Sequence, residues 1–131
     1  VIVAKRAAAG FAAVAGLDVE ALDDLVIAVA QACENVILLT ERAAGPGCGQ
    51  LRLHFSLADR ALEVQVRSCL SHAELEEAAR RRSAQAAVEA RAREAEEVAM
   101  RVIGLFVDDF GYRMDARTGG MRVRLTKYLV R

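Results

Sequence analysis

The stretch that decides the fold is Asp23–Thr40, which reads DDLVIAVAQACENVILLT. Its larger apolar residues recur at intervals of three and four, the spacing of one buried face of an α-helix. These residues are Leu25, Val26, Val29, Cys33, Val36 and Ile37. On a neighbouring stripe Gln31 and Asn35 lie one helical turn apart, so their amides are side by side. Because a polar group on a half-buried helix costs free energy without partners, we expect groups outside the helix to contact this pair.

Composition limits the class of protein. The chain has 131 residues, of which 54% are hydrophobic, and this size favours a single domain over residues 1–131. The formal net charge is zero, so bulk electrostatics favours neither nucleic acid nor a membrane surface as a partner. The three cysteines have no CxxC pair and no zinc-type spacing, which is typical of reduced thiols in a cytoplasmic protein.

No segment has the pattern of a membrane span or a signal peptide. The longest apolar run, residues 98–110, is interrupted by Arg101 and two aspartates. The opening segment, VIVAKRAAAGFAAVAG, carries its charges after an apolar start and is followed by no clear cleavage site. We therefore expect cytoplasmic localisation.

Two helices are expected in the first third of the chain. Residues 2–15 are rich in alanine, and Gly16 is a suitable C-terminal cap for a helix there. Asp18 is a suitable N-cap for the second helix, which should extend to about Arg42. Residues 43–49 contain the only proline and three glycines, and they predict a loop.

Apolar and polar residues then alternate in two segments, which predicts a β-hairpin with one buried face. Residues 58–60 should form its turn. The apolar positions are Leu51, Leu53, Phe55 and Leu57 in the first strand and Leu62, Val64 and Val66 in the second.

Residues 71–98 differ in character, because glutamate, arginine and alanine dominate and neither glycine nor proline occurs. Glutamate and arginine repeatedly lie four positions apart, which supports a helix. Ser71 and Glu74 fit a capping box at its start. Because the segment has few large apolar residues, this helix should be exposed or should pack on a partner chain.

The next helix is expected over residues 98–110, with Gly111 ending it. The segment has a core pattern with two stripes at helical spacing. One runs through Val98, Val102, Leu105, Phe106 and Asp109, and the other through Ile103, Phe106 and Phe110.

The C-terminal residues predict a short strand at 112–115, a turn at 118–120 and a final strand at 121–129. The order of elements is therefore helix, helix, strand, strand, helix, helix, strand, strand. This order predicts an α/β (α+β) two-layer sandwich, with helices on one face of a mixed, mostly antiparallel sheet.

Three motifs resemble a known family. Asp24–Asn35, reading DLVIAVAQACEN after the Gly-Leu pair at 16–17, is similar to a helix of the form Leu-x-x-Ala-Val-x-Glu-Ala-x-x-Asn-Ala. Gly119–Leu125, reading GGMRVRL, is similar to a closing strand Gly-Gly-Thr-x-Val-x-Leu, and Val107–Phe110 to Val-Asp-Glu-Val. With these motifs the chain resembles the bacterial anti-sigma-factor serine kinases. They belong to the ATPase superfamily of DNA gyrase, the heat-shock chaperone and sensor histidine kinases.

The resemblance implies a histidine-kinase-type ATPase fold with a site for ATP and Mg²⁺. Asn35 stands at the position whose carbonyl oxygen helps to hold the Mg²⁺ ion, for which a hard oxygen ligand is suitable. The acidic residue one turn earlier, the family's general base, is Gln31 here. An amide cannot accept a proton near neutral pH, so Gln31 argues against catalysis. Phosphoryl transfer depends mostly on positioning and electrostatics, which leaves a divergent kinase as an alternative.

The other nucleotide motifs depart from the family. Residues 67–71, RSCLS, stand in place of Asp-x-Gly-x-Gly, and Met121 replaces the closing threonine. Residues 93–101, REAEEVAMR, contain none of the lid glycines whose backbone amides would cradle phosphates. A charged helical insert, residues 71–98, in the place of the ATP lid favours contact with protein over ATP.

We therefore expect an anti-sigma-factor-like regulatory protein that acts by protein binding in a partner-switching system, with a degenerate ATP site. Its partner would be a sigma factor or an anti-sigma antagonist, and the resemblance implies a homodimer. Two alternatives are a divergent ATP-dependent serine/threonine kinase that retains Asn35 and a scaffold whose charged helix self-associates.

Overall fold

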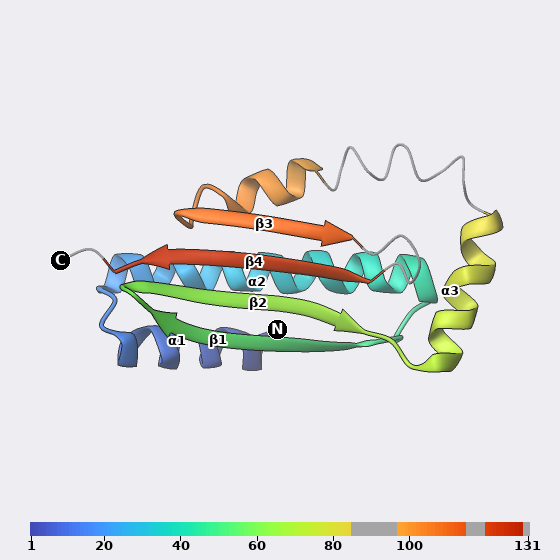
Figure 1. The fold of residues 1–131 in the computed structure, drawn as a ribbon, viewed down its shortest axis with the longest axis horizontal. Coiled ribbons are helices and arrows are strands. Elements are labelled where there is room, and N and C mark those ends of the chain that lie inside the picture. Colours follow the sequence, from blue (N-terminus) through green and yellow to red (C-terminus); the bar gives the residue numbers. More distant parts are fainter. Residues whose placement is uncertain (85–96, 115–119, 130–131) are drawn as a thin grey trace.

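The protein is a two-layer α+β sandwich in which helices cover one face of a four-stranded sheet (Figure 1). This computed structural model describes residues 1–84, 97–114 and 120–129. The elements are α1 (Ile2–Ala15), α2 (Val19–Ala44), β1 (Gln50–Ala58), β2 (Ala61–Cys69), α3 (His72–Ala84), β3 (Asp109–Met114) and β4 (Met121–Tyr128). A further helical segment, residues 97–103, precedes β3. In the described part of the chain, no helix is both long enough and apolar enough to cross a membrane.

Helix α2 forms the centre of the core, as its apolar spacing predicts. Leu25, Val29, Cys33 and Val36 are fully buried against the inner face of the sheet. Each large aliphatic side chain buried in this way stabilises the fold by about 1.5–3 kcal/mol. Helix α1 packs beside α2, and Phe11 places its ring centroid 5.3 Å from that of Phe55 on β1. The first helix therefore covers the part of the sheet that α2 leaves open.

The strand order is β1-β2-β4-β3, and every pair is antiparallel. The predicted sandwich is confirmed; within the described residues the sheet is antiparallel throughout, where the sequence predicted a mixed, mostly antiparallel one. The predicted hairpin is confirmed, with Asp59 and Arg60 both at positive φ (49° and 66°), the geometry of a type I′ turn. The C-terminal strand β4 lies between β2 and β3, so residues far apart in the sequence become neighbours.

The predicted caps of the first two helices are confirmed. The backbone of Gly16 is left-handed (φ 90°), and its N–H closes α1 on the carbonyls of Ala12 and Ala13. Asp18 Oδ1 accepts a hydrogen bond of 2.7 Å from the backbone N–H of Ala21, which satisfies one free donor at the start of α2.

Glu74 anchors the start of α3 to the loop that follows α2. One carboxylate oxygen accepts from the Ser71 backbone N–H at 2.9 Å, and Ser71 Oγ accepts from the Glu74 N–H at 3.2 Å, the predicted capping box. The other oxygen accepts from the backbone N–H of Gly49. These backbone hydrogen bonds, that from Ser71 first, lower the pKa of Glu74 from its usual 4.5. The charged carboxylate is therefore the form that holds α3 in place.

The segment before β3 differs from the sequence prediction. Its helix ends at residue 103, and Gly111 lies within β3 instead of ending a helix. Of the two predicted stripes, the first is exposed, because Val98, Val102 and Leu105 are 61%, 41% and 79% accessible. The second is confirmed at Ile103, which is fully buried. The buried side chains are Met100, Ile103 and Val107. Both the exposed residues and the buried ones recur at helical spacing, so spacing alone cannot tell them apart. Packing against α2 buries the set that contains Met100 and Ile103.

Two predicted features lie partly outside the described residues. The charged helix is described as α3 up to Ala84, and residues 85–96 of the predicted segment fall outside. Residues 118 and 119 of the predicted turn also fall outside. The final strand, β4, is confirmed with its inward residues Met121, Val123 and Leu125 buried.

Substitution of Gly104 tests the turn that redirects the chain into β3. A Cβ atom at Gly104 would lie 2.5 Å from Cε1 of Phe110, so the half-buried ring must move. We predict that Gly104→Ala lowers the free energy of unfolding by about 1–3 kcal/mol in urea titrations. The control is Gly10→Ala in α1, where a Cβ meets nothing within 4 Å. It should stabilise by about 0.5–1 kcal/mol through helix propensity. Equal effects at the two sites would contradict the packing.

The Glu74 anchor predicts a pH-dependent contribution to stability. Because its folded pKa is lowered, the contribution is complete above the ordinary pKa of 4.5 and is lost as pH falls through the lower folded value. Glu74→Gln should therefore lower the melting temperature at neutral pH, and the difference from wild type should vanish in acid. The control is Glu76→Gln, because the carboxylate of Glu76 lies 3.0 Å from His72 Nε2 between two exposed side chains and this contact should matter little. A difference that persists in acid would refute the assignment.

Candidate functional site

Gln31 and Asn35, the amide pair predicted from the spacing of α2, bond to each other. Gln31 Nε2 donates a hydrogen bond of 2.9 Å to Asn35 Oδ1. Gln31 is half-buried, and Asn35 is only 7% exposed inside an otherwise apolar cluster. The pair thus supplies part of its own hydrogen bonding, because two amides one turn apart on a helix face each other.

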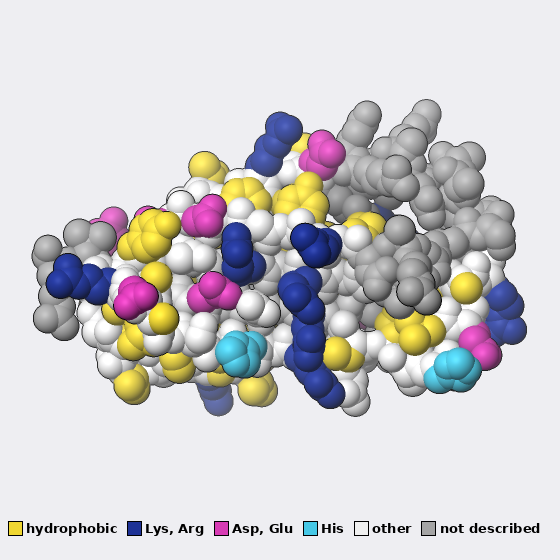
Figure 2. All heavy atoms as spheres, in the orientation of Figure 1, with side chains coloured by type: hydrophobic (Ala, Val, Ile, Leu, Met, Phe, Trp, Pro, Cys, Tyr) yellow, Lys and Arg dark blue, Asp and Glu magenta, His cyan; other side chains and the backbone are white. Residues whose placement is uncertain are grey.

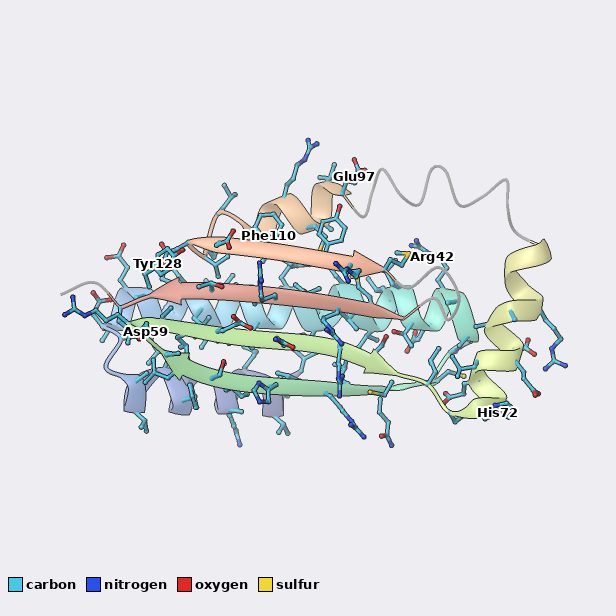
Figure 3. All side chains as sticks on the ribbon, viewed as in Figure 1. Arg42, Asp59, His72, Glu97, Phe110 and Tyr128 are labelled. Atoms are coloured by element: carbon cyan, nitrogen blue, oxygen red, sulfur yellow. The ribbon has the colours of Figure 1, made fainter. Side chains whose placement is uncertain are left out.

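Met100 supplies the contact from outside the helix that the sequence led us to expect. Its Sδ atom lies 4.0 Å from Asn35 Nδ2, the long limit of an N–H···S contact. Met100 is 1% exposed and belongs to the helical segment that begins at Glu97, beside β3 (Figure 3). Sulfur is a weak acceptor, so the thioether covers the amide as much as it bonds to it. Within the described residues, every buried side-chain nitrogen and oxygen has a hydrogen-bond partner.

Ser68 and Met121, which stand at two of the altered nucleotide motifs, are also brought together. Ser68 Oγ accepts a hydrogen bond of 3.0 Å from the backbone N–H of Met121. Met121 is 2% exposed and packs into the same core cluster as Met100. The residues at these nucleotide-motif positions, Ser68 on β2, Met121 on β4 and Asn35 on α2, therefore make contacts within the protein.

These residues do not fit ATP and Mg²⁺. The Asn35 amide is enclosed by Gln31 on one side and the thioether of Met100 on the other. A Mg²⁺ ion requires several oxygen ligands in near-octahedral geometry. The glycines that would let phosphates approach the backbone are absent from 67–71 and 93–101.

The Val107–Phe110 stretch, which also resembles a family motif, forms hydrogen bonds with the end of β4. Asp108 Oδ2 accepts from the backbone N–H of Tyr128 at 2.6 Å, and its own N–H donates to Thr126 at 3.0 Å. Lys127 Nζ lies 3.9 Å from a carboxylate oxygen of Asp24 and 3.4 Å from the carbonyl of Phe106. These contacts fasten the end of β4 to the segment before β3 and to α2.

Cys33, two residues before Asn35, is buried and chemically quiet. Burial raises the pKa of its thiol to about 11. At neutral pH the neutral thiol predominates, and the thiolate is the nucleophilic form. Cys33 therefore acts as a small apolar residue on the buried face of α2.

The model of the histidine kinase-like ATPase domain matches residues 1–127. The chain therefore belongs to the histidine kinase-like ATPase domain family. A comparison with curated protein sequences gives no match.

Sequence reasoning found the two amides and missed the residue that covers them. Gln31 and Asn35 were predicted to be side by side from helical spacing alone. Met100 was not singled out, because neither predicted stripe of this segment, through Val98 and Val102 or through Ile103 and Phe106, includes it. The signal that could have identified it is the parallel series of Met100 and Ile103, three residues apart on the opposite side of the helix.

A double-mutant cycle measures whether the amide pair acts as a unit. Gln31→Ala, Asn35→Ala and the double variant should give a coupling energy of about 0.5–1.5 kcal/mol in urea titrations, the net value of a hydrogen bond. The control combines Asn35→Ala with Gln65→Ala on β2, whose amide bonds to Glu63 at 2.9 Å. Those two effects should add. Additivity of the Gln31 and Asn35 effects would show that the hydrogen bond contributes nothing.

Proposed function

We propose that this domain is an anti-sigma-factor-like regulatory protein that acts by binding another protein in a partner-switching system. Its partner would be a sigma factor or an anti-sigma antagonist, and it would function as a homodimer in the cytoplasm. Membership of the histidine kinase-like ATPase family supports the broad class. The particular role rests on the resemblance of the α2 and β4 motifs.

One observation carries the proposal: the Asn35 amide is bonded to Gln31 and covered by Met100. A nucleotide site needs that asparagine oxygen open to a metal ion, together with glycine backbone that approaches phosphates. Here a 1% exposed methionine lies against the amide. The geometry supports a domain that keeps the scaffold of an ATPase and uses its surface for binding.

Gln31 supports the same conclusion for catalysis. A side-chain amide accepts no proton near neutral pH, so it cannot act as a general base toward a serine hydroxyl. Its Nε2 group is already engaged as the donor to Asn35. The divergent serine/threonine kinase remains the second candidate, favoured by the retained position of Asn35 on α2.

Thermal shift with Mg-ATP separates the two candidates. A ligand at about 100 times its Kd stabilises the native state by about 2.7 kcal/mol, which gives a readable rise in melting temperature. We predict no saturable rise for the wild type, for Asn35→Ala or for Gln31→Glu. A saturable rise in the wild type that Asn35→Ala abolishes would contradict the proposal and support the kinase.

The binding role has its own readout. The purified domain should form a complex with a purified sigma factor or anti-sigma antagonist from its native host, detected by titration calorimetry without nucleotide. Failure to bind any protein of these two classes would contradict the role, even if ATP binding is also absent.

A further inference from the structure

Four arginines lie in one row across the outer face of the sheet. The register places Arg52 of β1 opposite Arg67 of β2, Arg67 opposite Arg122 of β4, and Arg122 opposite Arg113 of β3. Helices cover the inner face, where Val66 and Val123 are buried, so the alternate positions point away from the core. Figure 2 shows a band of basic side chains across this face.

The row is electrostatically unfavourable for the isolated fold. Like charges directly opposite each other on neighbouring strands destabilise a sheet. Within the described part of the chain, none of these four arginines forms an ion pair with a carboxylate. Arg124, one row away, shows the contrast, because its guanidinium lies 3.9 Å from a carboxylate oxygen of Asp109. A partner that supplies negative charge would relieve the repulsion.

Among the described residues, the outward positions next to the row are not acidic. On the side toward the β1–β2 turn these positions are His54, Gln65, Arg124 and Gly111, and on the other side the described ones paired in the sheet are Gln50 and Cys69. The outward acids, Glu63 and Asp109, lie a further row along the strands, where Glu63 accepts from Gln65 and Asp109 faces Arg124. The row is therefore a line of positive charge on a solvated face.

The spacing of the row selects the kind of partner. Neighbouring strands lie about 4.8 Å apart, and successive turns of an α-helix rise about 5.4 Å, so an acidic helix laid across the strands can present one carboxylate to each arginine. On one side of an extended chain, carboxylates recur about every 6.6 Å, which is too far apart to match the spacing of the four arginines. Single-stranded nucleic acid would need stacking aromatics, and the outward tyrosine, Tyr128, lies at the other end of β4 (Figure 3).

We propose that the outer face of the sheet is a docking surface for an acidic helical segment of a partner protein, held by Arg52, Arg67, Arg113 and Arg122. This inference goes beyond the proposed function, because it concerns the sheet face opposite α2 and holds whether or not the partner belongs to a sigma-factor system. Arginine suits the role, since its guanidinium binds carboxylates through two parallel hydrogen bonds.

The test measures fluorescence anisotropy with a labelled alanine-based helical peptide that carries four glutamates at intervals of four, three and four residues, so that they lie on one face of the helix. Arg67→Gln/Arg122→Gln should weaken its binding about tenfold or more, with affinity in the wild type falling as salt is added. The matched control, Arg6→Gln/Arg101→Gln, makes the same change in net charge at exposed positions on helices. It should change the affinity less than about twofold by comparison, because exposed charges distant from the site are screened.

Stability and competition complete the test. Because Arg67→Gln/Arg122→Gln removes repulsion between paired residues, its melting temperature should equal or exceed that of the wild type. Arg52→Gln/Arg113→Gln, on the two edge strands, replaces it if the first variant does not fold. Equal loss in the control variant would overturn the proposal. It would also be overturned if duplex DNA or anionic phospholipid vesicles bound the wild type more tightly than the peptide.

Discussion

The structure depends on one constraint: α2 must bury its long apolar face against the sheet while a polar amide lies inside that face. Leu25, Val29 and Val36 are fully buried, and each contributes about 1.5–3 kcal/mol. Asn35 is carried into the same interior, where an unbonded amide would cost about 1–3 kcal/mol. The hydrogen bond from Gln31 and the thioether of Met100 meet that requirement. The core and the candidate site are therefore the same set of contacts.

This arrangement shows how a member of an ATPase family can use the asparagine of α2 within its own core. Where a nucleotide site needs the asparagine oxygen free for a metal ion, this chain uses that oxygen within the helix. Met100 lies beside the amide, so the Asn35 side chain is buried in the core. The opposite face of the sheet is unaffected by this burial. Its row from Arg52 to Arg113 is solvated and positively charged, which leaves the surface as the part of the molecule suited to binding.

The predictable features were local ones. Helical spacing placed Gln31 beside Asn35, and strict alternation defined the hairpin, because both depend on residues close in sequence. The contact between Asn35 and Met100 joins residues 65 positions apart and depends on how the chain returns to α2. The arginine row depends on β4 lying between β2 and β3, which alternation cannot indicate. Before β3 the sequence indicated two stripes at helical spacing, and only packing decided between them: Ile103 of the second is buried, whereas Val98 and Val102 of the first are exposed.

The central claim is that the Asn35 side chain is committed to contacts within the protein. It is tested most directly by NMR of the Asn35 side-chain NH₂ group, assigned with Asn35→Asp. The account predicts that its protons exchange slowly with solvent and that their chemical shifts do not change when Mg-ATP is added. A saturable shift of these signals with Mg-ATP would show that the amide is open to the nucleotide and would contradict the account.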